Sequence, residues 1–155
     1  MEIFNKNGLK FKCQKCSACC GKSPGFVFLS KKDLEKLCDF FSMKPAEFVE
    51  KYCRWTVYYE GKTVLALFEQ KNYDCVLWNN GCSAYEARPV QCRTYPFWDW
   101  MIKSEEMWNE CAADCPGMNK GPLHSAEEIL LQAEEYVQNE PLTIEEFNSL
   151  NFELL

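Results

Sequence analysis

Histidine is nearly absent from this sequence: of 155 residues, the only one is His124. Its Gly-Pro-Leu-His context predicts a solvent-facing loop, and no Ser/His/Asp arrangement for nucleophilic catalysis is available. A Gly-rich strand–turn–helix fingerprint for a nucleotide-type cofactor is missing as well. A general acid or base would have to be a carboxylate or a tyrosine, and the sequence singles out neither. Whether the chain is an enzyme is therefore left open.

Long apolar runs are also missing, since none approaches the roughly 18 residues that a membrane-spanning helix needs. The first residues, MEIFNKNGLKFKC, lack the apolar stretch and the small-residue cleavage site of a signal peptide. We therefore expect a cytoplasmic protein that does not enter a membrane. Thiols stay reduced in that compartment, so dense cysteine spacing indicates metal binding more than a disulfide framework.

Positive charge is scarce: 17 Lys and Arg stand against 23 Asp and Glu, which gives a net charge of −6. Residues 125–155 carry −8, and residues 1–124 carry +2. Without a basic field, nucleic-acid binding through phosphates has little support. The sequence predicts a cysteine-cluster metal-binding domain over residues 1–124 and an acidic C-terminal helical segment over residues 125–155 packed on it. An acidic tail is usually a solvated helix face, and docking of an unknown protein partner is the alternative.

Two of the 11 cysteines follow helical periodicity. Cys38 lies on the apolar face of a helix predicted after Ser30, where Asp33 completes an N-cap signal. Cys53 lies on the apolar side of a second helix, which we expect to begin near Pro45. Because a thiol packs as a small hydrophobe, both cysteines are predicted to belong to the core rather than to a ligand set.

The remaining elements indicate an α+β fold in a small single domain. A short strand is predicted over residues 26–29, and residues 55–69 predict a β-hairpin that turns at Gly61-Lys62. Capping signals at Ser125 and Thr143 predict two C-terminal helices. With 47% apolar and 15% aromatic residues the chain is globular. We expect a loop-rich metal-binding core with a small antiparallel sheet and flanking helices.

The densest chemical signal is a C-x2-C-x2-C-C run formed by Cys13, Cys16, Cys19 and Cys20. A C-x2-C unit can turn back and offer two thiolates to one metal. Neighbouring side chains of an extended chain point to opposite sides, so Cys19 and Cys20 face two centres, or one of them only supports the other. Five further cysteines lie in turn-rich surroundings: Cys75, Cys82, Cys92, Cys111 and Cys115.

The metal and the number of centres stay open at this point. Two tetrahedral S4 sites would use eight of these nine thiols, and one site would use four. Paired C-x2-C units are usual for structural zinc, whereas C-x2-C-x2-C with a distant Cys-Pro is typical of bacterial [4Fe-4S] proteins. The Asn79-Asn80-Gly81 turn can bring Cys75 and Cys82 together. Arg88 and Arg93 can offset the negative charge of a centre near Cys92, or they are ordinary surface arginines.

Three stretches, FKCQKCSACC, CVLWNNGCSAYEARPVQCRTYPF and CPG, resemble the CxxCxxCC cysteine-cluster family (YkgJ-type, zinc- or iron-chelating proteins) and cover about residues 11–117. Arg88 and Arg93 belong to the same pattern, whereas Ser17 replaces a frequent glycine and Cys111 is an extra thiol. The resemblance implies this ligand set: Cys13, Cys16, Cys19, Cys20, Cys75, Cys82, Cys92 and Cys115.

The resemblance implies metal binding and says little about activity, although some relatives resemble flagellin lysine methylases. The leading hypothesis is a protein that holds one or two all-cysteine centres, [4Fe-4S] or Zn²⁺, with a redox role or a role accessory to protein modification. The alternative is a zinc-stabilised structural or interaction module without catalytic activity.

Overall fold

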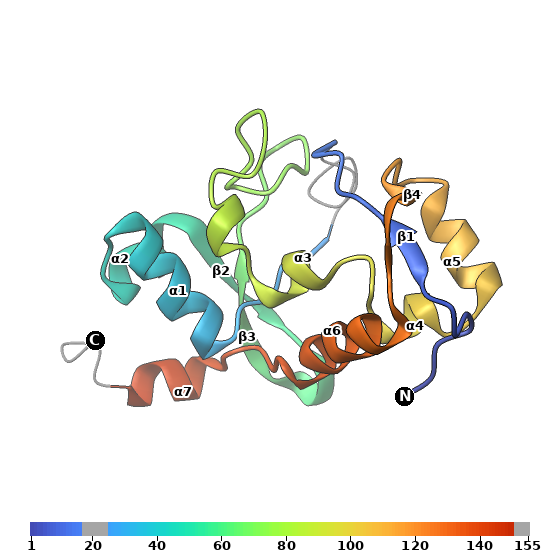
Figure 1. Ribbon diagram of the computed structural model, residues 1–155. Helices are drawn as coiled ribbons and strands as arrows, with labels where there is room; N and C mark the ends of the chain where they lie inside the picture. Colours follow the sequence, from blue (N-terminus) through green and yellow to red (C-terminus); the bar gives the residue numbers. More distant parts are fainter. Residues whose placement is uncertain (17–24, 151–155) are drawn as a thin grey trace. The chain divides into compact units, whose positions relative to one another are not determined.

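The computed structural model describes residues 1–16 and 25–150, and contacts within the chain divide it into two units (Figure 1). The first unit contains residues 1–16 and Val90–Asn139. The second contains residues 25–89 and 140–150. Each unit has its own two-stranded antiparallel sheet and its own hydrophobic core.

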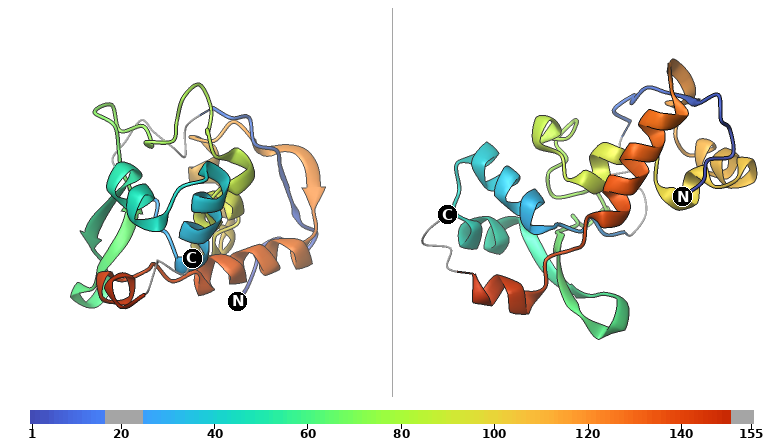
Figure 2. Two further views of the ribbon diagram at one scale, coloured as in Figure 1. Left: turned by 90° about the vertical axis from the view of Figure 1, so that its left-hand side faces the viewer. Right: turned by 60° about the horizontal axis from the view of Figure 1, so that its bottom comes forward.

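The hairpin predicted over residues 55–69 is confirmed as the sheet of the second unit (Figure 2). Strand β2 (Cys53–Val57) pairs with β3 (Thr63–Leu67) in continuous antiparallel register, and the 3-10 turn η1 (Tyr59–Gly61) joins them. The strand predicted over residues 26–29 is reduced to one isolated bridge, between Phe28 and Ala66. The outer edge of β3 is shared by two segments, because Thr143 also forms a bridge to this strand.

The helices of the second unit begin where their capping residues predict. Helix α1 (Lys31–Phe41) has a capping box in which the Ser30 hydroxyl accepts from the Asp33 amide and the Asp33 carboxylate accepts from the Ser30 amide. Helix α2 (Pro45–Tyr52) starts at its proline, as expected. Cys53 is a correction: it is the first residue of β2 and lies outside the helix. This unit also contains η2 (Tyr85–Ala87) and α7 (Ile144–Ser149).

The sheet of the first unit joins the two sequence segments that make up this unit. Strand β1 (Leu9–Phe11) pairs antiparallel with β4 (Met118–His124), as Figure 1 shows. The predicted Ser125 cap begins helix α6 (Ala126–Gln138), which packs against two of the short helices, α3 and α4 (Figure 2). The short helices of this unit are α3 (Val90–Thr94), α4 (Asp99–Ile102) and α5 (Glu105–Ala112).

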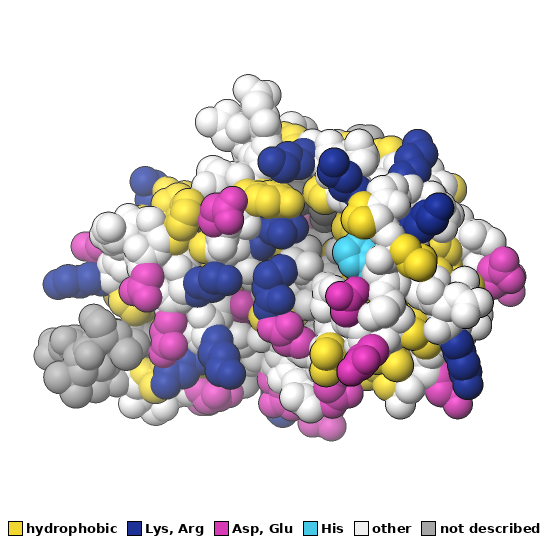
Figure 3. All heavy atoms as spheres, in the orientation of Figure 1, with side chains coloured by type: hydrophobic (Ala, Val, Ile, Leu, Met, Phe, Trp, Pro, Cys, Tyr) yellow, Lys and Arg dark blue, Asp and Glu magenta, His cyan; other side chains and the backbone are white. Residues whose placement is uncertain are grey.

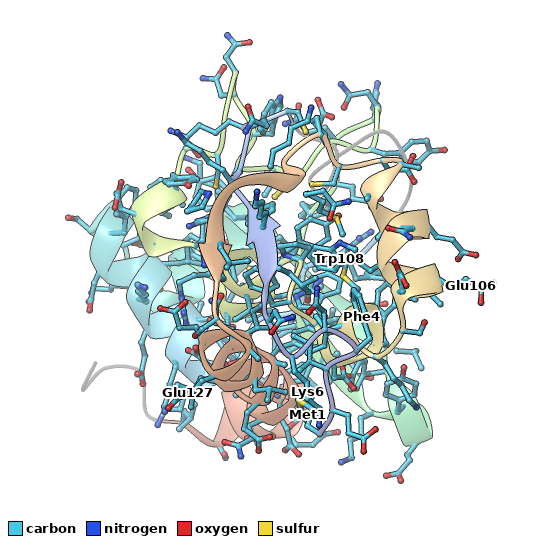
Figure 4. The ribbon with its side chains drawn as sticks, turned by 45° about the vertical axis from the view of Figure 1, so that its right-hand side comes forward. Met1, Phe4, Lys6, Glu106, Trp108 and Glu127 are labelled. Carbon is cyan, nitrogen blue, oxygen red and sulfur yellow. The ribbon has the colours of Figure 1, made fainter. Side chains whose placement is uncertain are left out.

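An aromatic cluster fills the core of the first unit. The Trp108 side chain is 1% exposed, and its ring stacks on Phe97 with 6.1 Å between centroids. Phe4 lies on Trp108 at 6.5 Å, and both residues are labelled in Figure 4. The buried indole N–H donates to the Asn119 side-chain oxygen at 2.8 Å. This contact fixes β4 to α5, because a buried donor is costly to leave without an acceptor.

The predicted α+β class, with small antiparallel sheets and flanking helices, is confirmed. The sequence predicts one sheet, and the described part of the chain has two. The compositional division at residues 124 and 125 stays a prediction. None of the described helices is both long enough and apolar enough to cross a membrane.

The contact between Trp108 and Asn119 gives a test of stability. Asn119 has φ +68°, which glycine also adopts, so Asn119→Gly removes the acceptor without straining the backbone. We expect the free energy of unfolding to fall by about 1–3 kcal/mol, measured by urea titration followed by circular dichroism.

The matched control is Asn80→Gly, at an exposed left-handed residue with φ +55°. This control should change the free energy of unfolding by less than about 0.5 kcal/mol. Equal losses in the two variants would show that the hydrogen bond to Trp108 contributes nothing.

Candidate metal centre

The C-x2-C turn at Cys13 is closed by a hydrogen bond to sulfur. The Lys15 amide donates to Cys13 Sγ at 3.4 Å, and Lys15 itself is left-handed with φ +52°. Both Cys13 and Cys16 are half-buried. Hydrogen bonds from amides to sulfur are a common way to orient a cysteine that binds a metal. Residues 13–15 thus form a turn that closes on the Cys13 sulfur.

The pairing of β1 with β4 joins the residue before Cys13 to the Cys115-Pro116-Gly117 segment. Beyond the last strand pair, Phe11 with Met118, the Lys12 amide donates to the Gly117 carbonyl at 3.1 Å. Cys13 follows this contact by one residue, and Cys115 precedes it by two. Cys115 is 8% exposed in the core of the first unit. Cys13, Cys16 and Cys115 thus lie at the same end of the sheet.

The extra thiol Cys111 lies in the last turn of α5, next to Cys115. Burial raises the pKa of Cys111, and the carboxylates of Glu110 and Asp114 raise it further, with a smaller contribution from Cys115. Cys111 is half-buried, and its carbonyl accepts from the Asp114 amide at 3.1 Å. Its position on a helix corrects the turn-rich setting expected from the sequence. Its part in metal binding stays open.

Cys75 and Cys82 lie in the second unit, at either end of a tightly hydrogen-bonded loop. The loop turns back as predicted: Trp78 forms a bridge to Cys82, and the Gln70 side-chain amide donates to the carbonyls of Cys75 at 3.0 Å and Trp78 at 3.2 Å. Both thiols are half-buried and pack against the core of this unit. The loop thus holds the backbone of both cysteines in place.

Cys92 lies on the five-residue helix α3, not in the loop expected, and is half-buried. Of the two nearby arginines, Arg93 contacts a carboxylate and Arg88 contacts an aromatic ring. Arg93 forms a two-pronged ion pair with Glu135 of α6. Arg88 lies over the Tyr85 ring at 3.9 Å and donates to the Tyr85 carbonyl at 3.0 Å. Their predicted contribution to a metal centre stays a prediction.

His124 is a correction to the sequence analysis. It is the last residue of β4 and is half-buried, and its Nε2 lies 3.0 Å from the Phe11 carbonyl oxygen. The imidazole packs edge-on against Phe97 with 5.2 Å between centroids, while part of the ring reaches the surface (Figure 3). The side chain therefore supports the sheet of the first unit.

The two cysteines assigned to the core are confirmed there. Cys38 is 4% exposed and Cys53 is 5% exposed. Burial raises the pKa of Cys38 to about 11, with Asp39 and Glu35 adding to the effect. Burial also raises the pKa of Cys53 strongly, and the neighbouring thiols of Cys38 and Cys75 contribute. Both thiols are surrounded by apolar side chains, so they belong to the packing of the second unit.

The donors fit a soft metal by their chemistry, because thiolates suit zinc and iron–sulfur clusters. No disulfide joins any of the nine described cysteines. Within residues 1–16 and 25–150, no three His, Cys, Asp or Glu side chains converge as a complete metal site. The predicted ligands Cys19 and Cys20 lie outside the described residues. What the described chain shows is a turn closed on the Cys13 sulfur and a backbone contact, from Lys12 to Gly117, between the segments that contain Cys13 and Cys115.

Residues 12–116, more than half of the chain, match the CxxCxxCC family, described as "Putative zinc- or iron-chelating domain". The chain belongs to this family. A relative from Methanocaldococcus jannaschii, described only as an uncharacterized protein, is 27% identical over 94 residues. That match covers 59% of this chain and 47% of the relative, so the chain matches about half the length of that protein. No solved structure matches.

The raised pKa values of the two core thiols predict that they react with alkylating reagents more slowly than the half-buried thiols do. With iodoacetamide at pH 8 and after chelation of metal, Cys13 and Cys16 should be modified in the folded protein, whereas Cys38 and Cys53 should be protected. A raised pKa keeps the thiol protonated below that pKa, so Cys38 should gain reactivity only as the pH approaches about 11. Peptide mass spectrometry reads each site, and urea-unfolded protein is the control. Modification of Cys38 as fast as Cys13 at pH 8 would contradict the assignment.

Proposed function

We propose that this chain is a metal-binding protein whose thiolates hold an all-sulfur centre, and that Cys13, Cys16 and Cys115 contribute to it. The observation that carries the proposal is their common position at one end of the β1–β4 sheet, where an amide already donates to Cys13 Sγ. Membership of a family described as zinc- or iron-chelating supports it.

The other proposed ligands follow the family pattern: Cys19, Cys20, Cys75, Cys82 and Cys92. The number of proposed ligands is compatible with two centres as well as with one, because eight thiolates complete two S4 shells. The described part of the first unit alone contains four of the eight: Cys13, Cys16, Cys92 and Cys115. Arg88 and Arg93 remain candidates for balancing the charge of a centre near Cys92.

When bound, zinc would supply a tetrahedral cross-link, whereas a [4Fe-4S] cluster would supply one-electron exchange. The chain's own residues do the same work in either case. The Lys15 amide donates to Cys13 Sγ and so orients this sulfur. Phe11, the last residue of the strand that leads into the turn, meets Phe97 edge to face at 5.8 Å and so attaches this end of β1 to the core of the first unit.

Metal and sulfide analysis of anaerobically purified protein, with visible and EPR spectra, tests this proposal. Stoichiometric zinc in a colourless protein identifies a zinc centre, and brown protein with about four irons and four sulfides per centre identifies a cluster. Protein that contains neither metal and takes up neither on reconstitution would contradict the proposal.

Ligand assignment follows from single substitutions. Cys13→Ser and Cys115→Ser should each lower the bound metal to half or less of the wild-type content, because each removes one thiolate from an all-thiolate shell. Cys38→Ala is the matched control, since that thiol is in the core of the second unit and its loss should leave the metal content unchanged. Cys111→Ser then shows whether the extra thiol takes part. Full metal content in Cys13→Ser would remove this residue from the ligand set.

The role of the metal is a further part of the proposal: redox chemistry, assistance to protein modification, or purely structural support of an interaction module. A structural zinc predicts that chelation unfolds the first unit. A redox centre predicts reversible one-electron reduction with little change in the circular dichroism spectrum. Unfolding on chelation and reversible reduction can be measured on the same preparation, so together they distinguish a structural zinc from a redox centre.

A further inference from the structure

Two glycines of the β4 segment lie against the residue that immediately precedes Cys13. A Cβ atom on Gly117 would stand 2.2 Å from the Lys12 carbonyl oxygen. A Cβ atom on Gly121 would stand 2.5 Å from Lys12 Cβ. Both distances are well inside the roughly 3.5 Å at which carbon atoms make contact. The carbonyl and Cβ of Lys12 therefore occupy space that is available only because both residues lack a side chain.

An irregular bulge of four residues in β4 brings Gly121 to this position. The register passes from Lys10 opposite Leu123 directly to Phe11 opposite Met118, so residues 119–122 are extra on the β4 side. Gly121 is left-handed with φ +78°, a conformation that glycine adopts without cost. The bulge is fixed to α5 because Asn119 accepts from the buried Trp108 indole, which Figure 4 labels beside the two strands.

We infer that Gly117 and Gly121 are positioning residues of the metal centre: they seat the backbone of Lys12 on β4 and so hold Cys13 beside Cys115. This inference rests on the proposed function, because it assigns these residues a purpose in metal binding. A metal site tolerates only small displacements of its ligands, because metal–sulfur distances vary by no more than about 0.2 Å. A Cβ at either glycine forces a larger shift of Lys12, the residue next to Cys13.

The chain provides matched controls for both glycines. Gly61 is left-handed with φ +74°, but a Cβ added there meets nothing within 4 Å. Gly25 has no left-handed φ and also faces open space, as a control for Gly117. Asparagine tolerates a left-handed backbone, so Gly121→Asn and Gly61→Asn carry the same backbone cost and differ in the contact with Lys12. Gly117→Ala and Gly25→Ala form the second pair.

The experiment measures binding of Zn²⁺ and Co²⁺ by the full-length variants. Competition with a chromophoric chelator gives the Zn²⁺ affinity, and the thiolate-to-Co²⁺ absorption bands report the geometry of the shell. We expect Gly121→Asn and Gly117→Ala to bind Zn²⁺ about tenfold or more weakly than the wild type, a loss comparable to that of other residues that orient metal ligands. Gly61→Asn and Gly25→Ala should bind as the wild type does, with unchanged Co²⁺ bands.

Amide hydrogen exchange in the metal-free protein separates seating from binding. The Lys12 amide, which donates to Gly117, should be protected in the wild type and in both controls and should exchange faster in Gly121→Asn and Gly117→Ala. Circular dichroism of the same samples identifies a variant that has lost its fold. If Gly121→Asn is unfolded, the test rests on Gly117→Ala, and the reverse holds if Gly117→Ala is unfolded.

Two outcomes would overturn the inference. One is wild-type affinity and Co²⁺ bands in Gly121→Asn and Gly117→Ala despite faster exchange at Lys12. The other is an equal loss of affinity in the controls. If the wild type itself binds neither Zn²⁺ nor Co²⁺ nor iron, the proposed function fails and the metal role of the glycines fails with it. The exchange data would still show whether the glycines seat Lys12.

Discussion

The antiparallel contact between residues 9–12 and 117–124 is the constraint on which the first unit depends. It joins an N-terminal strand of three residues to a segment that begins just after Cys115. Leu9 points into the core, and the next contact along, from the Lys12 amide to the Gly117 carbonyl, leads directly into the Cys13 turn. Because Gly117 has no side chain, the two backbones approach closely at this point. The position of the candidate ligands is therefore a consequence of strand pairing.

Burial divides the described cysteines into groups with different chemistry. Cys38 and Cys53 are covered by apolar side chains, which disfavour the thiolate and make both sulfurs part of the packing. Cys13 is half-buried, and its sulfur accepts a hydrogen bond from the Lys15 amide. Cys115 differs from both, since it is buried but lies at the sheet end where the Cys13 turn begins. A metal would supply the positive charge that a buried thiolate at this position needs.

Features that depend on neighbours in sequence could be predicted, and features that depend on distant pairing could not. The caps at Ser30 and Ser125, the hairpin, and the core position of Cys38 follow from local chemistry and periodicity. Cys53 is buried as predicted, but as the first residue of β2 and not on a helix. The β1–β4 sheet joins residues 113 positions apart, and its bulge contains a Gly-Pro pair that by itself indicates a loop. Helix α3 is too short to show a helical repeat, so Cys92 was assigned to a loop. The candidate ligands were recognised by spacing, whereas the glycines that seat Lys12 become visible only when β1 and β4 are paired.

Strand pairing and metal binding should also support each other energetically. A two-stranded ribbon is marginally stable in water, and β1 contributes only three residues to this one. Burial of Ile3 before the ribbon and of Leu9 at its start anchors the N-terminal segment, but the segment beyond Lys12 depends on the contact with Gly117. A centre that joins Cys13 and Cys16 to Cys115 would close the open end of the ribbon. Since a ligand that binds only the paired state stabilises that state, such a centre would link metal affinity thermodynamically to attachment of the N-terminal segment.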